Sequence, residues 1–594
     1  MERRLRVTEM KNDARMLRRL FFRLIPVQIL LVAIGSLNAV IDGVMASRFI
    51  GPEAMTVTGL YMPLIKIIET VNAVLLGGSQ ILCGQFLGKN QLRRTRSVFS
   101  LDMLTVFGLS ALVTAVCLLF PTGTALCLGA DGASVQGLRA YILGTAAGIL
   151  PQMLCAQLSA FLQLEQQNKR VYVGIVLMMA VNALLDYLLI VVLRWELLGL
   201  GLATALSYWA FFLVLGSYYL KKKAVIRFSL RGIAWKDLGP IIRIGLPGAL
   251  VVLCLALRGF AVNALLLRYA GSDGVAALAA LNTFGGLLYA ATAGIASTTR
   301  LLISVYIGEE DRVGIVQIMK TALFRGVPIV MGVAAAVCLA ATPLTGVFYR
   351  DPSAQVFRLT ELLFRIYPLC MPLSAICVIF INYYQSSARM GIVNLLSVMD
   401  GAAGVCLSSL VLAPIFGAGG VWAAHVLNGV YTTVAVFLYA WIKNRRFPRG
   451  FEALLTMDES FGVPRDRRLA ITVRDAAEVP AVSERVIAFC KEMGLDAKRA
   501  FHAGLCMEEL AANVVQHGFG DGKRHSAELR VIKKPDTLLL RIKDDCRRFD
   551  PKEVVDMMDP ADVTHNIGLR IVSRFAKEMN YNCALGLNVL SIEL

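Results

Sequence analysis

The chain has 594 residues, of which 57% are hydrophobic and 17% charged, and its mean hydropathy is +0.63. This composition excludes an ordinary soluble protein of this length and predicts an integral membrane protein. The formal net charge is +18, but the excess of Lys and Arg lies mostly before residue 455, in connections between apolar segments. Cytoplasmic loops of membrane proteins carry such an excess, so nucleic-acid binding is not expected. The 13 cysteines are scattered and form no C-x-x-C pair, which argues against zinc and a disulfide framework.

Apolar segments of membrane-spanning length follow one another up to residue 442. A bilayer core of about 30 Å requires roughly 20 mainly apolar residues per helix. After a charged lead-in over residues 1–20, which we expect to be cytoplasmic and not a cleavable signal peptide, the sequence predicts an all-α polytopic membrane protein with twelve transmembrane helices. The predicted spans cover 21–46, 56–83, 98–120, 139–164, 171–193, 197–220, 240–267, 275–306, 322–348, 363–385, 391–414 and 418–442.

Alternate connections between these spans are basic. Lys and Arg gather at 89–96, 169–170, 221–231 and 443–446, whereas 121–137 and 414–419 are almost free of them. The alternation places both termini in the cytoplasm of a multi-pass plasma-membrane protein. The long basic connection at 221–239 separates two six-helix halves, 21–220 and 240–442, which is the usual plan of an alternating-access carrier.

Three polar side chains lie deep in the predicted spans of the first half. Asp42 is in the first span, and Asn182 and Asp186 are four residues apart in the fifth, so that they share a helix face. A charge in hydrocarbon costs several kcal/mol unless it is paired or hydrated, which makes each residue a functional candidate. Their oxygen atoms could bind Na⁺ or carry a proton. In the alternative interpretation they satisfy one another structurally.

Other polar positions in the spans allow more than one interpretation. Lys66 and Glu69 are three residues apart and predict an ion pair on one helix face. Arg258 and Arg300 could meet an anionic substrate, or extend their charged ends toward the interface. Asp400 in the eleventh span could be the counterpart of the acid in the fifth.

The membrane part resembles the multidrug and toxic-compound extrusion (MATE) family. The resemblance rests on the twelve spans in two halves, the Asp of the first span, the N-x-x-x-D of the fifth, and the stretches GPEAMTVTGLYMP at 51–63 and GGSQILCGQFLGKN at 77–90. It implies export of small organic, mainly cationic, compounds coupled to Na⁺ or H⁺, with Asp42, Asn182 and Asp186 matching the cation site of the family. Flippases of lipid-linked sugars share the architecture and remain an alternative.

The character of the sequence changes after a linker at 443–464. Residues 465–594 predict an α/β sandwich with three helices and shorter hydrophobic periods. The predicted elements are strand 469–474, helix 478–494, helix 498–517, strand 526–533, strand 537–543, a loop, helix 567–578 and strand 583–594.

This tail carries polar residues at a spacing that suits a nucleotide. Glu509, Asn513 and His517 follow one another every four residues and fall on one helix face, where Asn513 can bind Mg²⁺ and Glu509 can act as a general base. Asp544 at a strand end can accept a hydrogen bond from the amino group of adenine. Gly568 at a helix start lets a phosphate approach the exposed N–H groups.

Taken together, these motifs resemble the GHKL ATP-binding fold, in particular the anti-sigma-factor serine kinases. The resemblance implies ATP and Mg²⁺ as ligands, with Asn513, His517, Asp544, Gly568 and Leu569 at the nucleotide. It departs from the family at 544–548, where Asp-Asp-Cys-Arg-Arg replaces the usual D-x-G-x-G, and at Asn566, where a glycine is common.

The tail has no P-loop motif, and the chain contains only one such domain, whereas a primary pump normally uses a pair of motor sites. We therefore do not expect the tail to power transport. Two hypotheses remain for it. It either regulates or signals from the transporter, or it is a serine/threonine protein kinase or anti-sigma-like switch that acts on a partner protein, with the membrane part as its sensor.

Overall fold

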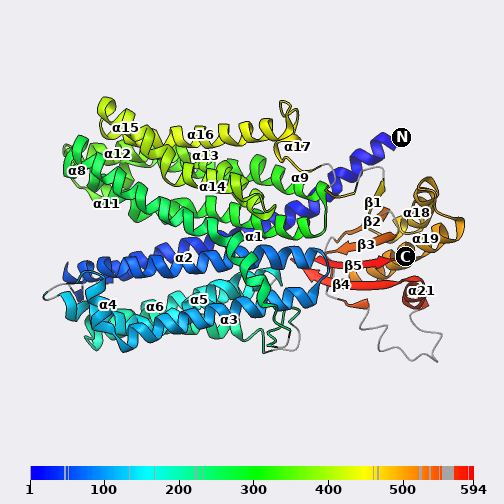
Figure 1. Ribbon diagram of the computed structural model, residues 1–594, viewed down its shortest axis with the longest axis horizontal. Helices are drawn as coiled ribbons and strands as arrows, with labels where there is room; N and C mark the ends of the chain where they lie inside the picture. The colour runs from blue at the N-terminus through cyan, green and yellow to red at the C-terminus, as the bar shows by residue number, and fades with distance from the viewer. Residues whose placement is uncertain are drawn as a thin grey trace.

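The computed structural model describes residues 2–45, 49–50, 52–130, 132, 134–165, 167–220, 224–230, 232–458, 461–463, 467–520, 525–533, 537–547, 549–551, 567–585 and 587–594. It consists of a long helical bundle with a small α/β domain against one of its ends (Figure 1). We call this end of the bundle the domain end. The predicted fold class, an all-α membrane bundle followed by a small α/β domain, is confirmed.

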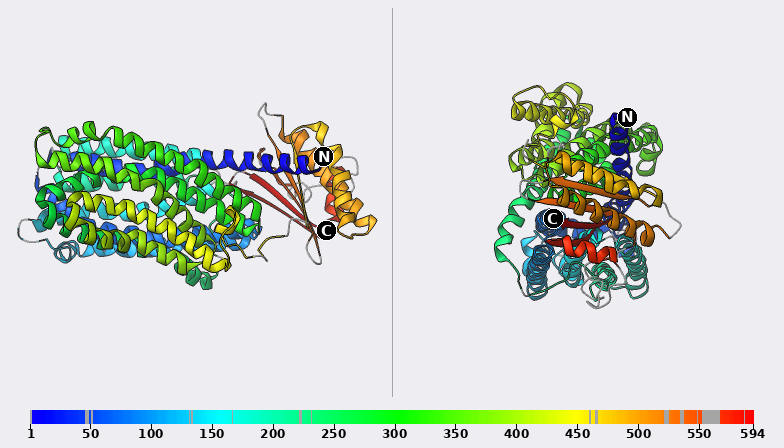
Figure 2. Two further views of the ribbon diagram at one scale, coloured as in Figure 1. Left: turned by 90° about the horizontal axis from the view of Figure 1, so that it is seen from above. Right: turned by 90° about the vertical axis from the view of Figure 1, so that its right-hand side faces the viewer.

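The first half of the bundle contains the helices up to residue 216. They are α1 (Glu2–Met45), α2 (Pro52–Gly88), α3 (Leu92–Leu119), α4 (Pro121–Cys127), α5 (Ser134–Leu164), α6 (Asn168–Asp186), the π-helical turn η2 (Tyr187–Val192) and α7 (Glu196–Gly216). Helix α1 extends beyond the bundle and reaches the α/β domain, where it contacts its first strand (Figure 2).

The second half begins with the short η3 (Trp235–Asp237) and the very long α8 (Leu238–Gly308). Gly271 in α8 has a φ of 64°, so the helix reverses there and forms two arms. The remaining elements are α9 (Arg312–Thr321), η4 (Ala322–Gly326), α10 (Val327–Leu339), α11 (Ala341–Phe348), α12 (Gln355–Ile366), η5 (Tyr367–Leu369), α13 (Cys370–Ser386), α14 (Met390–Val398), η6 (Met399–Ala403), α15 (Gly404–Phe416), α16 (Ala418–Asn444) and α17 (Phe451–Leu454).

Ten helical segments in the described part of the chain are long and apolar enough to cross a membrane. One of them, Trp235–Gly308, contains both arms of α8, and α1 adds a further long helix. The predicted ninth span, 322–348, is misplaced, because the helix runs from Arg312 to Leu339 and α11 follows as a separate piece. Pro343 has no N–H for the carbonyl of Leu339, so a continuous helix would lose a hydrogen bond there.

The two halves pack closely at the domain end, where α2 of the first half meets the second arm of α8. Gly88 and Gly308 face each other, and a Cβ on either would overlap the backbone of the opposite helix. The Nε2 of Gln85 also donates to the carbonyl of Ser386 across the same boundary at 2.9 Å. We call this boundary, formed by α2 against α8 and α13 at the domain end, the seam.

The α/β domain is built on a five-stranded antiparallel sheet in the order β1-β2-β3-β5-β4. Its elements are β1 (Arg468–Val473), η8 (Ala476–Glu478), α18 (Pro480–Glu492), α19 (Ala497–Gly518), β2 (Ala527–Lys533), β3 (Leu538–Asp544), α21 (Ile567–Phe575), β4 (Glu578–Ala584) and β5 (Leu587–Glu593). The single predicted strand 583–594 is wrong, because the chain turns at Leu585, whose φ is 55°, and forms a hairpin. The predicted helix 567–578 ends at Phe575, since β4 takes the following residues.

The sheet has two different faces. Helices α18, α19 and α21 cover one face and enclose an apolar core that includes Val486, Met507 and Leu540. The other face is turned toward the helical bundle (Figure 2). Successive residues of a strand point to opposite faces, so of two neighbouring residues on β3 or β4 one faces the covering helices and the other faces the bundle.

Candidate functional site

The structure brings the three predicted residues of the first half together. Asp42 lies near the end of α1, Asn182 lies in α6, and Asp186 is the last residue of α6 before the π-helical turn η2. Asn182 and Asp186 are buried, with 1% and 0% of their surfaces exposed. The carboxyl groups of Asp42 and Asp186 are close enough to interact electrostatically, so two helices contribute to one acidic cluster.

Most polar atoms of this cluster have no hydrogen-bond partner within the described part of the chain. These are Oδ1 of Asp42, both oxygens of Asp186 and both polar atoms of Asn182. Burying such groups without partners costs free energy, and in native proteins they usually meet a ligand, an ion or ordered water. The donor set is oxygen-rich, which suits a hard cation such as Na⁺ and also a proton.

Two further polar residues were not predicted from the sequence. One is a neighbour of the acidic cluster, and the other is a separate buried acid on α3. Thr204 on α7 donates its hydroxyl hydrogen to Oδ2 of Asp42 at 3.3 Å. Asp102 on α3 is fully buried, and neither carboxylate oxygen has a hydrogen-bond partner among the described residues. The signal for Asp102 was available, since it is a single acid inside the predicted third span.

The second half arranges its buried acid differently. Asp400 lies in η6, another π-helical turn, and its Oδ1 accepts a hydrogen bond from Nδ2 of Asn428 at 3.0 Å. Nη1 of Arg258 donates to the backbone carbonyl of Asp400 at 3.2 Å. Arg300 instead bridges the two halves, with Nε donating to Oε1 of Gln80 at 3.0 Å.

The predicted ion pair between Lys66 and Glu69 is present at 2.7 Å. Both side chains are about half exposed within the protein. This pair therefore belongs to a helix face and contributes little to stability.

Four of the predicted nucleotide residues of the tail line a cavity of about 190 Å³. Asn513 and His517 reach it from α19, Asp544 from the end of β3 and Leu569 from α21. The lining is completed by Leu510, Val514, Gly518, Ile542, Cys546, Arg547, Phe549, Pro551, Tyr581, Asn588 and Leu590. An apolar cavity with a few convergent polar groups is the usual form of a small-molecule site.

Asp544 is held in a chain of hydrogen bonds at this cavity. The hydroxyl of Tyr581 donates to Oδ1 of Asn588 at 2.7 Å, and Nδ2 of Asn588 donates to Oδ1 of Asp544 at 2.7 Å. The backbone N–H of Cys546 also donates to Oδ1 of Asp544, at 3.0 Å. Burial raises the pKa of Asp544 above its usual value, and the hydrogen bonds offset part of that rise.

Glu509 on α19 and Gly568 at the start of α21 lie against each other, although neither lines the cavity. A Cβ on Gly568 would overlap the carboxylate of Glu509, so the start of α21 approaches α19 only because this residue is a glycine. Nδ2 of Asn513 is buried and has no hydrogen-bond partner among the described residues. The unpartnered Nδ2 of Asn513 could donate to a ligand that has acceptor groups. The Oδ1 of the same side chain could face a cation. Asn566, the predicted departure from the family motif, lies outside the described residues.

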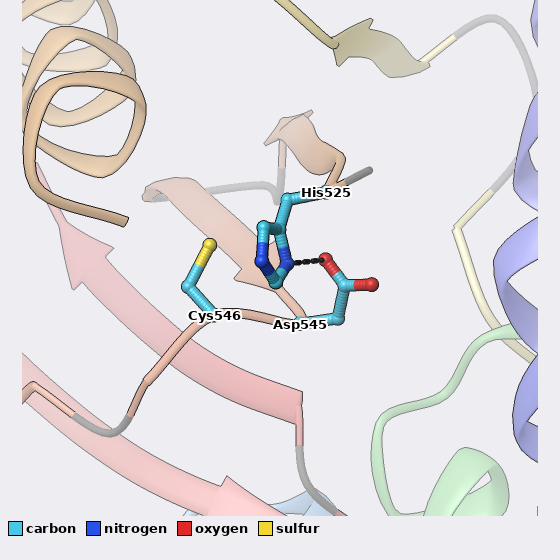
Figure 3. A group of neighbouring side chains, drawn as sticks. All are labelled: His525, Asp545 and Cys546. Carbon is cyan, nitrogen blue, oxygen red and sulfur yellow. Dashed lines mark hydrogen bonds and ion pairs between the residues drawn. The ribbon is translucent and has the colours of Figure 1, made fainter. Parts of the chain in front are cut away.

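His525, Asp545 and Cys546 form a group beside this cavity whose donor atoms lie within 4.8 Å of one another. Figure 3 shows the imidazole between the thiol and the carboxylate. Nδ1 of His525 is 3.1 Å from Oδ1 of Asp545, which also accepts from the N–H of Ser526, and the imidazole stacks on Phe519. These contacts join the residues before β2 to those after β3 and account for the arrangement without an ion.

Comparison with protein families decides the membrane part. Residues 28–188 and 247–400 match the model of the family described as MatE, and together they make up more than half of the chain. The chain belongs to the MatE family. Residues 472–593 match a second model, the histidine kinase-like ATPase domain, which covers nearly all of the sheet and its helices. Both resemblances expected from the sequence motifs are confirmed.

Similar proteins cover the MatE part. "Multidrug export protein MepA" of Staphylococcus haemolyticus is 23% identical over 438 residues, which are 69% of this chain and 92% of that protein. "Probable multidrug resistance protein NorM" of Synechococcus sp. is 26% identical over 287 residues, which are 46% of this chain and 60% of that protein.

Solved structures give the same fold. An outward-facing multidrug resistance MATE family transporter has a TM-score of 0.67 and 21% identity, over 71% of this chain and 95% of its own. A transporter of the MOP superfamily from Pyrococcus furiosus, described as having a binding pocket of reverse polarity, has a TM-score of 0.66 and 20% identity, over 73% and 97%. At these identities the likeness establishes the fold.

Proposed function

We propose that this MatE-family chain is an antiporter that exports small organic compounds in exchange for Na⁺ or H⁺. The observation that carries the proposal is the acidic cluster of Asp42, Asn182 and Asp186, in which every oxygen except Oδ2 of Asp42 has no hydrogen-bond partner among the residues that the structure describes. A bound Na⁺ or proton would offset one of the two carboxylate charges that otherwise lie close together in the membrane. The multidrug names of the relatives MepA and NorM support organic compounds as the exported class.

The two-half architecture supports transport by alternating access. The halves pack tightly at the seam, which is the contact that must open and close if substrate is to reach the path from the domain end. Binding of a cation can shift the balance between two arrangements only if it binds one of them more tightly. The cluster lies within the first half, so a change in its charge can alter how that half packs.

The domain end faces the cytoplasm in this proposal. The basic residues at 89–96, 169–170 and 443–446 lie at or near the ends of α2, α5 and α16 on this side, since Leu87, Leu164 and Asn444 at these helix ends contact the α/β domain or its linker. Positive charge concentrated on one side of the membrane is typical of the cytoplasmic side.

The α/β domain binds ATP with Mg²⁺ and regulates the transporter or signals from it. Support comes from the family match, from Asp544 held by Asn588 beside the cavity, and from Nδ2 of Asn513, which has no partner among the described residues and would donate to the nucleotide, while Oδ1 of Asn513 would contribute to binding Mg²⁺. His517, Gly568 and Leu569 would complete the nucleotide site. Calorimetry of the purified full chain with Mg-ATP tests this part, and heat of binding that persists in Asn513→Ala and Asp544→Asn together would contradict it.

A second candidate function is protein phosphorylation by the same domain. It is favoured by the position of the Glu509 carboxylate against Gly568, where a general base would meet the phosphates. Transfer of labelled phosphate from ATP to a partner protein, lost in Glu509→Ala, would establish it. The flippase alternative receives no comparable support, because Arg258 and Arg300 are engaged by protein groups.

Export of a fluorescent cationic dye from proteoliposomes tests the antiporter. Na⁺ and H⁺ gradients would be imposed separately on wild type, Asp42→Asn and Glu509→Ala. We expect gradient-driven export in wild type and in Glu509→Ala, and none in Asp42→Asn. Export that survives in Asp42→Asn would rule out the acidic cluster as the coupling site.

A further inference from the structure

The helix-free face of the sheet carries charged residues that are buried against the bundle. Glu528 and Arg530 on β2, and Arg541 and Lys543 on β3, have between 1% and 7% of their surfaces exposed. Charged side chains are rarely this buried unless they are paired. We call this face, together with the β4–β5 hairpin, the docking face.

The docking face meets the second half of the bundle through ion pairs. Lys543 pairs with Glu309 at the end of α8, and its ammonium group lies 4.3 Å from the centre of the Tyr306 ring. Arg530 pairs with Asp311, the N-cap of α9, and Arg468 reaches the same carboxylate at 2.9 Å. These pairs hold β1, β2 and β3 against the turn between α8 and α9.

The docking face meets the first half through the β4–β5 hairpin. Nδ2 of Asn582 donates to the carbonyl of Leu87 at the end of α2, at 2.8 Å. The N–H of Leu585 donates to the carbonyl of Leu164 at the end of α5, also at 2.8 Å. Leu585, Leu587 and Val589 are buried in the same apolar cluster as the membrane helices.

The two sets of contacts lie on opposite sides of the seam. Leu87 is adjacent to Gly88 on α2, and Glu309 is adjacent to Gly308 on α8, so one docking contact in each half lies one residue away from the glycines that pack the halves together. The five strands are hydrogen-bonded into one sheet, which therefore spans the boundary as a single piece.

We propose that the docking face is a clamp that holds the two halves together at the domain end. Opening the seam would require the first half to leave the hairpin, or the second half to leave the buried ion pairs. The linker favours the first route, because Arg312 pairs with Glu452 at 2.6 Å and Tyr383 donates to the carbonyl of Leu455, which fix the linker to the second half. The domain then stays with the second half, and the contacts that release are those of Asn582 and Leu585 together with that of α1 on β1.

The clamp lies directly behind the nucleotide cavity, which links the two sites physically. On β3, Lys543 points to the bundle while Asp544 lines the cavity, and on β4, Asn582 contacts α2 while Tyr581 lines the cavity. If the cavity binds ATP as proposed above, nucleotide and docking act on the same strands and each alters the other by the same factor. This regulatory role rests on the proposed function, whereas the clamp itself does not.

The distance between the two halves at the domain end tests the clamp directly. The two nitroxide labels would replace Arg93 on α3 and Lys443 on α16, which are exposed positions in the two halves. They would be attached to non-canonical amino acids, so that the 13 native cysteines stay unlabelled. Double electron–electron resonance on the purified full chain, without substrate or gradient, would compare wild type with Leu585→Asp and Lys543→Glu. A matched control is Arg365→Glu, which breaks the exposed pair with Glu361.

We expect a single short distance in wild type and in Arg365→Glu, and an added longer distance in Leu585→Asp and Lys543→Glu. The exchange Glu309→Lys with Lys543→Glu should restore the short distance, because the pair is rebuilt with its charges reversed. Well-folded Leu585→Asp and Lys543→Glu samples that keep the wild-type distance would overturn the clamp.

The measurement separates the clamp from the antiporter. Variants that lengthen the distance while wild type exports no dye would leave the clamp standing and reject the proposed transport. Gradient-driven export by wild type with an unchanged distance in both variants would reject only the clamp. If Lys543→Glu fails to fold, Asn582→Ala with Leu585→Asp tests the first-half contacts alone.

Discussion

The fifth and eleventh spans of this protein occupy corresponding places in the two halves, yet they treat a buried carboxylate differently. In the fifth, Asp186 precedes a π-helical turn, and neither of its oxygens has a hydrogen-bond partner among the described residues. In the eleventh, Asp400 lies within a π-helical turn and accepts a hydrogen bond from Asn428. A shared backbone irregularity therefore accompanies one acid that is open to a ligand and one that is already engaged.

This difference indicates which buried acid is the better candidate for binding the coupling ion. An acid with a protein partner is satisfied in the resting structure, whereas an acid without one leaves room for a cation or a proton. The same criterion extends to the α/β domain. Asp311 is fully paired with arginines, and Asp544 is partnered on one oxygen beside an open cavity.

The strongest test of the comparison is Asp186→Asn. It keeps the size of the side chain but removes a charge from the acidic cluster, so we expect gradient-driven dye export to fall to the level of protein-free liposomes. The matched control is Asp102→Asn, since Asp102 is equally buried but, within the described part of the chain, lies beside Ser79 and Cys83 and not beside a second carboxylate. Loss of export in both variants would show that an unpartnered acid alone, and not the cluster, is what matters.

Asp311→Asn should have the next largest effect, on docking. Asn still caps α9, but the guanidinium groups of Arg530 and Arg468 lose their charge partner while they stay buried. Breaking a buried pair in this way costs about 3–5 kcal/mol. We therefore expect faster hydrogen exchange in the amides of β2, measured by mass spectrometry. Asp351→Asn, at an exposed aspartate, should leave that exchange unchanged.

The pH dependence of wild-type docking has a defined sign. Burial alone would raise the pKa of Asp311, but Arg530 and Arg468 outweigh it and hold the pKa well below the usual 3.8. A carboxyl whose pKa is lowered in the folded state stabilises that state above its unfolded pKa, and the contribution is lost as the pH falls below it. Protection of β2 should thus be constant from about pH 8 to pH 5. A steep loss near pH 6 would mean that another group controls docking.

How far the sequence predicted this molecule depended on how local each signal was. Hydropathy predicts the long apolar helices, and acids inside those helices point to Asp42 and Asp186. Glu509, Asn513 and His517 share a helix face by spacing alone. Thr204, Asn588 and Tyr581 were missed, because each meets its partner through tertiary folding and has no motif of its own.

The errors have equally physical causes. The strand 583–594 was drawn through Leu585 because the residues around it are apolar, although the following Gly586 is a turn signal. The docking face was missed because Arg530 and Lys543 alternate with apolar residues, as on a strand with one solvated face. Only the position of the bundle shows that this face is buried.

Asp544→Asn should weaken ATP binding by roughly tenfold or more, since hydrogen bonds to a charged acceptor contribute about 1.5–3 kcal/mol.

Burial raises the pKa of Asp544, so its charged form destabilises the unliganded domain above that pKa, and the penalty disappears as the pH falls through it. The variant should therefore slow hydrogen exchange in β3 at pH 7.5, and the difference should shrink toward pH 4. Calorimetry and exchange on the full chain measure both effects. Weaker binding together with faster exchange would point to misfolding.

Asp400→Asn should have the smallest effect and completes the comparison. The carbonyl oxygen of the new Asn can still accept from Asn428, and Arg258 bonds the backbone at this position, so both contacts survive the change. We expect dye export to stay within about twofold of wild type, which corresponds to less than 0.5 kcal/mol. Asn428→Ala, which removes the partner, should destabilise the protein by about 1 kcal/mol in thermal unfolding and leave coupling intact. Export abolished by Asp400→Asn would mean that the second half also binds a coupling ion, and that a hydrogen bond from Asn428 does not take an acid out of the transport cycle.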